Sequence, residues 1–287
     1  MTTQAARGRP AAVSELPRVF RRREPRIISV TGGKGGVGKS SVAVNLALGL
    51  QALGGRILLL DGDLGLANAD QLLGVRAAST LWTVIRGEIA LENAVVETPY
   101  GISLLPACSG REEMANLGGE AHTALVRGVR GLAGRFDFVV VDTAAGIGTT
   151  AIGLASAGDT ILDVTTPDPT AVRDAFSIAK VLSKGHGVRR IELVVNMVSG
   201  RDEGLDLFRR LSAVAGRFLP VTLGLAGCVV HDPCVAKAVR ERRPFLSAYP
   251  ASAASRQIRE LATHVVRLDR EALAARGCFE NRGKETP

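Results

Sequence analysis

The stretch that decides the fold is Gly33-Lys34-Gly35-Gly36-Val37-Gly38-Lys39-Ser40, which joins an aliphatic run (27–31) to a helical pattern (38–53). It matches the spacing G-x-x-x-x-G-K-[ST], which requires a strand before it and a helix after it. The glycines let backbone N–H groups approach phosphate oxygens closely, and the helix adds its positive N-terminal end. Lys39 supplies a charge for the β- and γ-phosphates, and Ser40 supplies a hydroxyl for Mg²⁺. The stretch therefore predicts the phosphate-binding loop of a nucleotide-binding protein.

On both sides of this loop, short aliphatic runs alternate with longer helical patterns. The runs, which predict strands, are 27–31, 56–61, 102–106, 138–142, 160–165, 191–196 and 221–224. The helical patterns are 38–53, 67–73, 79–86, 120–133, 149–156, 169–183, 203–215, 234–241 and 252–275. Each run is continuously apolar, as strands buried on both faces are. We therefore expect an α/β fold: a doubly wound, mostly parallel sheet with helices on both faces.

Composition divides the 287 residues into three segments. Residues 1–25 predict a disordered basic leader, residues 26–275 a single P-loop ATPase domain, and residues 276–287 a polar C-terminal tail. Of the net charge of +8, residues 1–26 carry +5, so the other 261 residues carry only +3. Because the basicity belongs to the leader, a solvated tail is favoured over contact with nucleic acid, acidic lipid or an acidic partner.

Targeting features are few. Nothing in the sequence reaches the run of about 18 apolar residues that spans a bilayer, and the N-terminal arginines are not followed by an apolar stretch. Four cysteines are too few for a disulfide scaffold. The expected compartment is the cytoplasm, with the cell pole or the periphery of the inner membrane as finer alternatives.

The ends of the predicted strands carry the polar residues that such a fold presents to a ligand. Asp61 and Asp63 follow the second strand and point toward the phosphates, where they can orient water or contact the shell of a metal ion; strand-ending turn chemistry is the alternative. Asp142 ends an aliphatic strand, a pattern in which the carboxylate holds Mg²⁺ through water. Gly146 lets the following backbone move with the γ-phosphate. Asn196 can pair with adenine, although an Asn in this place is often a turn residue.

Lys34 is a second lysine that an ordinary phosphate loop does not need. It can reach a phosphate held by a second copy of the chain, or it can simply face solvent. The run from Lys34 to Ser40 resembles the deviant Walker A motif of the MinD/ParA family of dimerising ATPases, and the resemblance extends over about residues 26–270. It implies slow, partner-stimulated hydrolysis of ATP with Mg²⁺, and an ATP-bound homodimer in which Lys34 contacts the partner's nucleotide.

The resemblance also implies roles for individual residues. Lys34, Lys39 and Asp63 would be catalytic, with Asp63 positioning the attacking water. Asp61, Asp63, Thr143 and Gly146 would belong to the two switch segments, and Ser40 and Asp142 would hold Mg²⁺. The ATP-binding set would be Gly33, Lys34, Gly35, Gly36, Val37, Gly38, Lys39, Ser40, Ser41 and Asn196. Ala144 departs mildly from the family's switch II pattern.

Within the family, several stretches resemble the regulators of flagellar number of the FlhG type most closely. They are 142–147, 165–170 with Asp174-Ala175, 231–239, 243–245 and 249–256. The resemblance implies a switch that positions or counts flagella at the cell pole, together with an SRP-like flagellar GTPase or a flagellar switch component as partner. The alternative is a DNA-partitioning or division-site ATPase of the same family, although the nearly neutral body counts against binding DNA.

Two weaker signals concern a membrane and a metal. The last helical pattern carries Ile258, Leu261, Val265 and Leu268 on one face, a stripe that serves core packing or lipid; core packing is favoured and no clear membrane anchor is present. Cys228-x-x-His231-x-x-Cys234 offers three soft ligands where a structural zinc takes four, so unligated thiols are favoured over a metal site.

Overall fold

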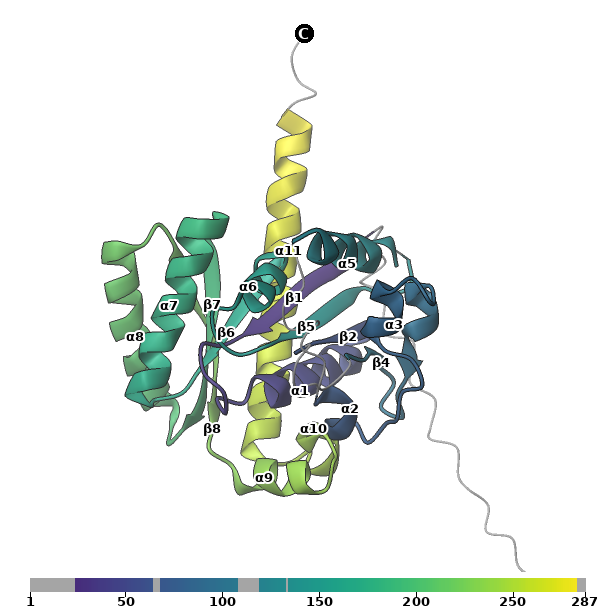
Figure 1. The fold of residues 1–287 in the computed structure, drawn as a ribbon. Helices are drawn as coiled ribbons and strands as arrows, with labels where there is room; N and C mark the ends of the chain where they lie inside the picture. The colour runs from purple at the N-terminus through teal and green to yellow at the C-terminus, as the bar shows by residue number, and fades with distance from the viewer. Residues whose placement is uncertain (1–23, 64–67, 108–118, 133, 283–287) are drawn as a thin grey trace, which may run out of the picture.

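The computed structural model describes residues 24–63, 68–107, 119–132 and 134–282 (Figure 1). Within them the strands form a single sheet in the order β3-β4-β2-β5-β1-β6-β7-β8. β3 is antiparallel to β4, and the other neighbours are parallel. The strands are β1 (Arg26–Thr31), β2 (Ile57–Gly62), β3 (Val96–Glu97), β4 (Ser103–Leu105), β5 (Phe138–Thr143), β6 (Thr160–Thr165), β7 (Arg190–Val198) and β8 (Thr222–Val230). The predicted doubly wound, mostly parallel sheet is confirmed.

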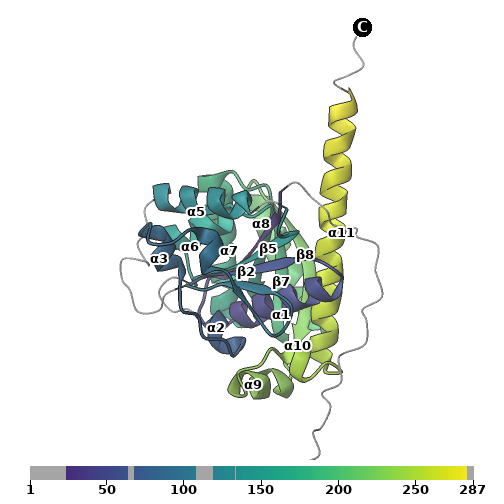
Figure 2. The ribbon, with the colours of Figure 1, turned by 90° about the vertical axis from the view of Figure 1, so that its right-hand side faces the viewer.

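Helices cover both faces of this sheet, as Figures 1 and 2 show. They are α1 (Lys39–Ala52), α2 (Ala69–Leu72), α3 (Leu81–Ile85), the 3₁₀ helix η1 (Leu91–Ala94), α5 (Gly119–Gly131), α6 (Thr149–Ser156), α7 (Pro169–His186), α8 (Arg201–Phe218), α9 (Pro233–Arg240), α10 (Phe245–Ala248) and α11 (Ala253–Arg282). One face packs against α1, α10 and α11, and the other against α3, α5, α6, α7 and α8. Every residue of β1, β2 and β5 is buried, which explains why these strands read as unbroken apolar runs.

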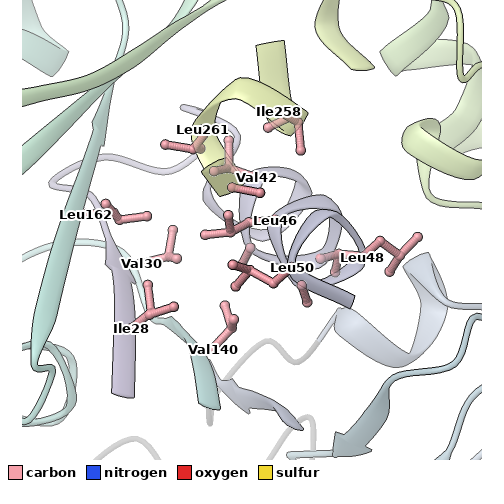
Figure 3. Close-up of a cluster of buried hydrophobic side chains, with 14 of the residues drawn as sticks. Ile28, Val30, Val42, Leu46, Leu48, Leu50, Val140, Leu162, Ile258 and Leu261 are labelled. Carbon is pink, nitrogen blue, oxygen red and sulfur yellow. The ribbon is translucent and has the colours of Figure 1, made fainter. Parts of the chain in front are cut away.

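The core beneath the phosphate loop is built by α1 and α11 together (Figure 3). Val42, Leu46 and Leu50 of α1 point toward the sheet, and Ile258 and Leu261 of α11 close the cluster from above. The two helices approach closely at Gly49, where an added Cβ would lie 3.0 Å from the Ala262 Cβ. The apolar stripe of the last helix therefore serves core packing, as expected from its sequence.

Buried ion pairs attach α11 to the first residue of β1, at the end of the strand far from the phosphate loop. Arg26 Nε lies 2.8 Å from Asp269 Oδ1, and Asp269 is 2% exposed. The same guanidinium lies 3.4 Å from Asp159 Oδ1, which Arg130 also approaches, at 3.5 Å. A buried carboxylate requires such partners because an unpaired charge is costly away from water. Beyond this point the helix projects clear of the body (Figure 2).

Several element boundaries differ from the sequence-based prediction. The last helix continues to Arg282 instead of ending at 275, and β8 reaches Val230 instead of ending at 224. Gly224 and Gly227 resemble a strand end in the sequence, but pairing with β7 carries β8 past them through a register shift. The short elements β3, η1 and α10 were not predicted. Of the expected leader, only residues 24 and 25 are described.

Candidate nucleotide site

The loop between β1 and α1 has the backbone that a phosphate cradle needs. Gly36 and Gly38 have φ angles of 84° and 91°, a region that side chains disfavour. Gly33 is constrained by space instead, because an added Cβ would lie 2.5 Å from the Asp174 Cβ and 2.6 Å from the carbonyl carbon of that residue. Gly38 is the N-cap of α1, so no capping side chain covers the positive end of the helix.

A cavity of about 620 Å³ opens in front of this helix end. Eight of the predicted site residues line it: Gly35, Gly36, Gly38, Lys39, Ser40, Ser41, Asp63 and Asn196. Lys39 is only 7% exposed, so its charge acts inside the cavity. The remaining predicted residues lie behind or beside this lining, and they are Gly33, Lys34, Val37, Asp61, Asp142, Thr143 and Gly146. The size suits a nucleotide, since small-molecule pockets span roughly 300–1,000 Å³.

Asp142 is buried directly behind Ser40 and Lys39. Burial and then the charge of Asp61 in the paired register raise the pKa of this carboxyl, a hydrogen bond with Ser40 and the charge of Lys39 oppose the shift, and the net pKa is about 7. Asp142 Oδ1 is buried without a hydrogen-bond partner. An acceptor left open beside a serine hydroxyl and a second carboxylate fits a divalent cation with oxygen ligands.

Asp61 organises the segment that carries Asp63. Its carboxylate accepts hydrogen bonds from the backbone N–H groups of Asp63 (3.2 Å), Asn68 (3.1 Å) and Ala69 (3.0 Å). Burial raises its pKa to about 6, against the effect of these three bonds. Asp61 therefore fixes the backbone at Asp63 and at the start of α2, and Asp63 itself lines the cavity.

The segment after β5 is tied to the phosphate loop through its backbone. The Gly146 N–H donates to the Gly32 carbonyl at 3.0 Å, and Gly146 has a φ of 93°. Thr143 is buried and its hydroxyl donates to the Ala144 carbonyl. A backbone hydrogen bond thus joins this segment directly to the start of the phosphate loop.

Lys34 points away from the cavity that Lys39 faces. Its Nζ lies 2.7 Å from the Thr170 hydroxyl and 3.4 Å from Asp168 Oδ1, and its side chain is 44% exposed. Asp168 caps the N-terminus of α7. Its carboxylate accepts hydrogen bonds from the Thr170 hydroxyl and from backbone N–H groups, and these bonds lower its pKa to about 2. The two lysines of one loop thus lie on opposite sides of it.

The wall opposite the phosphate loop was not predicted from the sequence. It is formed by Met197, by residues 230–232 at and just after the end of β8, and by Val235, Ala236 and Val239 of α9. Asn196 lies at the edge of this wall and faces the cavity. Its side-chain amide also donates a hydrogen bond to the Val37 carbonyl at 2.8 Å, which fixes the phosphate loop. Ligands of such folds lie beyond the carboxyl ends of the strands. A prediction that ended β8 at Val230 would therefore have identified this wall.

The three residues of the cysteine-histidine spacing lie in different surroundings. His231 lines the nucleotide cavity, whereas Cys228 lies on β8 against α8, and Cys234 begins α9. Among the described residues, no three His, Cys, Asp or Glu side chains meet closely enough to share a metal ion. Likewise, none of the described helices is long and apolar enough to cross a membrane.

Comparison with known proteins gives consistent matches over this same region. Residues 24–266 match the family described as ParA, NUBPL iron-transfer P-loop NTPase. The chain is 41% identical over 240 residues to the antiactivator FleN of Pseudomonas aeruginosa, covering 84% of this chain and 86% of that protein. It is 34% identical to the flagellum site-determining protein YlxH of Helicobacter pylori, covering 83% and 80%. The septum site-determining protein MinD of Pyrococcus horikoshii OT3, solved with Mg-ADP, superposes with a TM-score of 0.72 at 25% identity, covering 85% and 97%.

Proposed function

Because this chain belongs to the ParA/MinD family of P-loop ATPases, we propose that it is an ATP-driven dimerising switch that regulates the position or number of flagella. Membership of this family supports nucleotide hydrolysis. The flagellum is proposed as the regulated assembly because the relative YlxH is a flagellum site-determining protein. The observation that carries the switch is the opposed placement of Lys39 and Lys34 in one loop. One lysine serves the chain's own cavity, and the other is presented outward to a second copy.

The bound species is ATP with Mg²⁺, a proposal supported by the Mg-ADP held by the related MinD and by the open Asp142 acceptor. The loop amides and Lys39 hold the phosphates, and Ser40 and Asp142 hold Mg²⁺, which supplies charge neutralisation on the phosphate oxygens. Asn196 and the wall from His231 to Val239 enclose the base.

We assign hydrolysis and dimerisation to three further residues. Asp63 orients the attacking water, because Asp61 fixes the backbone on which it stands. Lys34 leaves Asp168 and Thr170 on dimerisation and neutralises charge in the partner's cleft, as an arginine finger does. Since the dimer is the regulatory output, hydrolysis is slow and is accelerated by a flagellar GTPase or switch component.

The test compares Lys34→Ala with wild type and with Lys184→Ala, a lysine outside the site in the last turn of α7. Light scattering with saturating Mg-ATP should give a dimer for wild type and Lys184→Ala, and a nucleotide-bound monomer without hydrolysis for Lys34→Ala. Asp63→Ala should accumulate the ATP-bound dimer. Wild-type dimerisation and phosphate release by Lys34→Ala would refute the trans contact.

A fluorescent fusion then separates the flagellar function from its alternative. Foci at the flagellated pole, together with altered flagellar number on deletion, support the proposal. Coverage of the nucleoid would instead favour a DNA-partitioning ATPase, and placement relative to the division plane would favour a division-site ATPase.

A further inference from the structure

The two edges of the sheet differ in a way that the nucleotide site does not explain. β3 at one edge is two residues long, whereas β8 at the other is nine residues long, and no described strand pairs with its outer side. Short edge strands protect a protein from unwanted pairing, and a long open edge is a template for another chain. The outer edge of β8 is therefore a candidate interaction surface.

The direction of the backbone groups on this edge follows from two hydrogen bonds. The Val230 N–H donates to the Gln257 side chain of α11 at 2.8 Å, and the next N–H, of His231, donates to Val198 of β7. Because successive backbone N–H groups of a strand point to opposite sides, the Cys228 N–H lies on the same open edge as that of Val230. Gln257 thus accepts a hydrogen bond from the Val230 N–H, whereas the Cys228 N–H stays available to an added strand.

A groove of about 590 Å³ runs along this edge. Its floor is residues 225–228 of β8, one side is Arg201 at the start of α8, and the other side is α11 from Gln257 to Arg267. At Gly227 no atom lies within 4 Å of the place a Cβ would occupy, so no side chain covers the face of the strand at this point of the floor. A strand paired at the usual spacing of about 4.8 Å would lie within such a groove.

The charges that line the groove select its occupant. Arg201, Arg259 and Arg267 line it, against a single acid, Glu260. Arg201 and Cys228 both line the groove, and the positive charge of Arg201 opposes the burial-driven rise in the pKa of the Cys228 thiol. A second β8 edge would bring six arginines together, and the chain's own leader is basic, so both are disfavoured.

We propose that an extended acidic segment of a partner protein adds to the outer edge of β8, with its carboxylates contacting Arg201, Arg259 and Arg267. Main-chain hydrogen bonds to the edge give affinity and the arginines give selectivity, as in other strand-addition complexes. The groove shares no lining residue with the nucleotide cavity, so the two sites are separate on the surface of the chain.

The probe is a fluorescein-labelled eight-residue peptide of alternating Glu and Val, with a Lys-Val peptide as its charge-reversed control. Fluorescence anisotropy should show at least tenfold tighter binding of the acidic peptide by the full chain. Arg201→Glu with Arg267→Glu should weaken this binding at least tenfold. Arg209→Glu with Arg217→Glu, the same charge change at exposed positions of α8 outside the groove, should leave it within twofold.

Hydrogen exchange distinguishes strand addition from simple charge attraction. The acidic peptide should slow exchange of the Cys228 amide, with the Asn196 amide inside the sheet as the reference. Undiminished binding by the Arg201→Glu, Arg267→Glu variant, or binding without protection of the Cys228 amide, would overturn the proposal. The proposal would also be overturned if phosphatidylserine vesicles bound the wild-type chain as well as the acidic peptide does and competed with that peptide. Arg201→Gln with Arg267→Gln provides a milder pair should the charge reversals unfold the chain.

Discussion

Replacing Asp142 by Asn should stabilise the nucleotide-free protein while abolishing hydrolysis. The carboxyl is 1% exposed, Oδ1 lacks a hydrogen-bond partner, and burial with the nearby Asp61 raises its pKa to about 7. Relative to an ordinary value of about 3.9, a shift of this size corresponds to about 4 kcal/mol at about 1.4 kcal/mol per unit, an upper limit at pH 8. Asparagine keeps an acceptor for Ser40 and removes the charge. We expect a gain of about 2–4 kcal/mol in the free energy of unfolding at pH 8.

The sign of the pH dependence makes this prediction sharper. A carboxyl whose folded pKa is raised lowers stability at any pH where the unfolded chain has it ionised, so the cost is absent below about pH 4, grows as the pH rises toward 7 and is complete by pH 8. The stabilisation by Asp142→Asn should therefore be large at pH 8 and vanish near pH 4. Urea unfolding of both proteins at the two pH values measures it.

Two outcomes would refute this reasoning. One is a variant less stable than wild type at pH 8, and the other is a difference that does not change with pH. Saturating Mg-ATP provides a control, because a bound cation stabilises the ionised carboxylate of the wild type and should erase the advantage of the variant.

Two further predictions concern the phosphate loop and the base of α11. Gly33→Ala should lower nucleotide affinity at least tenfold in a titration with fluorescent ATP, because its Cβ has no room beside α7; Gly35→Ala, which meets no atom within 4 Å, should bind within threefold of wild type. Asp269→Ala should lower the free energy of unfolding by about 3 kcal/mol, because it leaves the buried charge of Arg26 short of a partner, whereas Glu271→Ala in an exposed pair should change it by less than about 0.5 kcal/mol. A loss in Asp269→Ala no larger than that in Glu271→Ala would show that the buried pair is not what fixes the helix.

Much of the architecture was predictable because its causes are local. The buried strands are unbroken apolar runs, and the phosphate loop is a spacing of glycines and a lysine between a strand and a helix. Both patterns follow from the geometry of a few consecutive residues, so they can be read without knowing what packs against them. The carboxyl ends of parallel strands meet at one edge, so the sequence predicts that Asp61 and Asp142 face the same ligand, whereas their pairing in neighbouring strands is a finding of the structure.

The tertiary structure decided what depends on residues far apart in sequence. Lys34 is turned outward by contacts with residues 134 and 136 positions away, and Asn196 holds a loop carbonyl 159 positions away. The end of β8, and with it one wall of the nucleotide cavity, was hidden because pairing with β7 overrides two glycines that would otherwise end a strand. Composition and periodicity specify which elements form. The direction of a side chain and the end of a paired strand are set by neighbours that only the folded chain brings into contact.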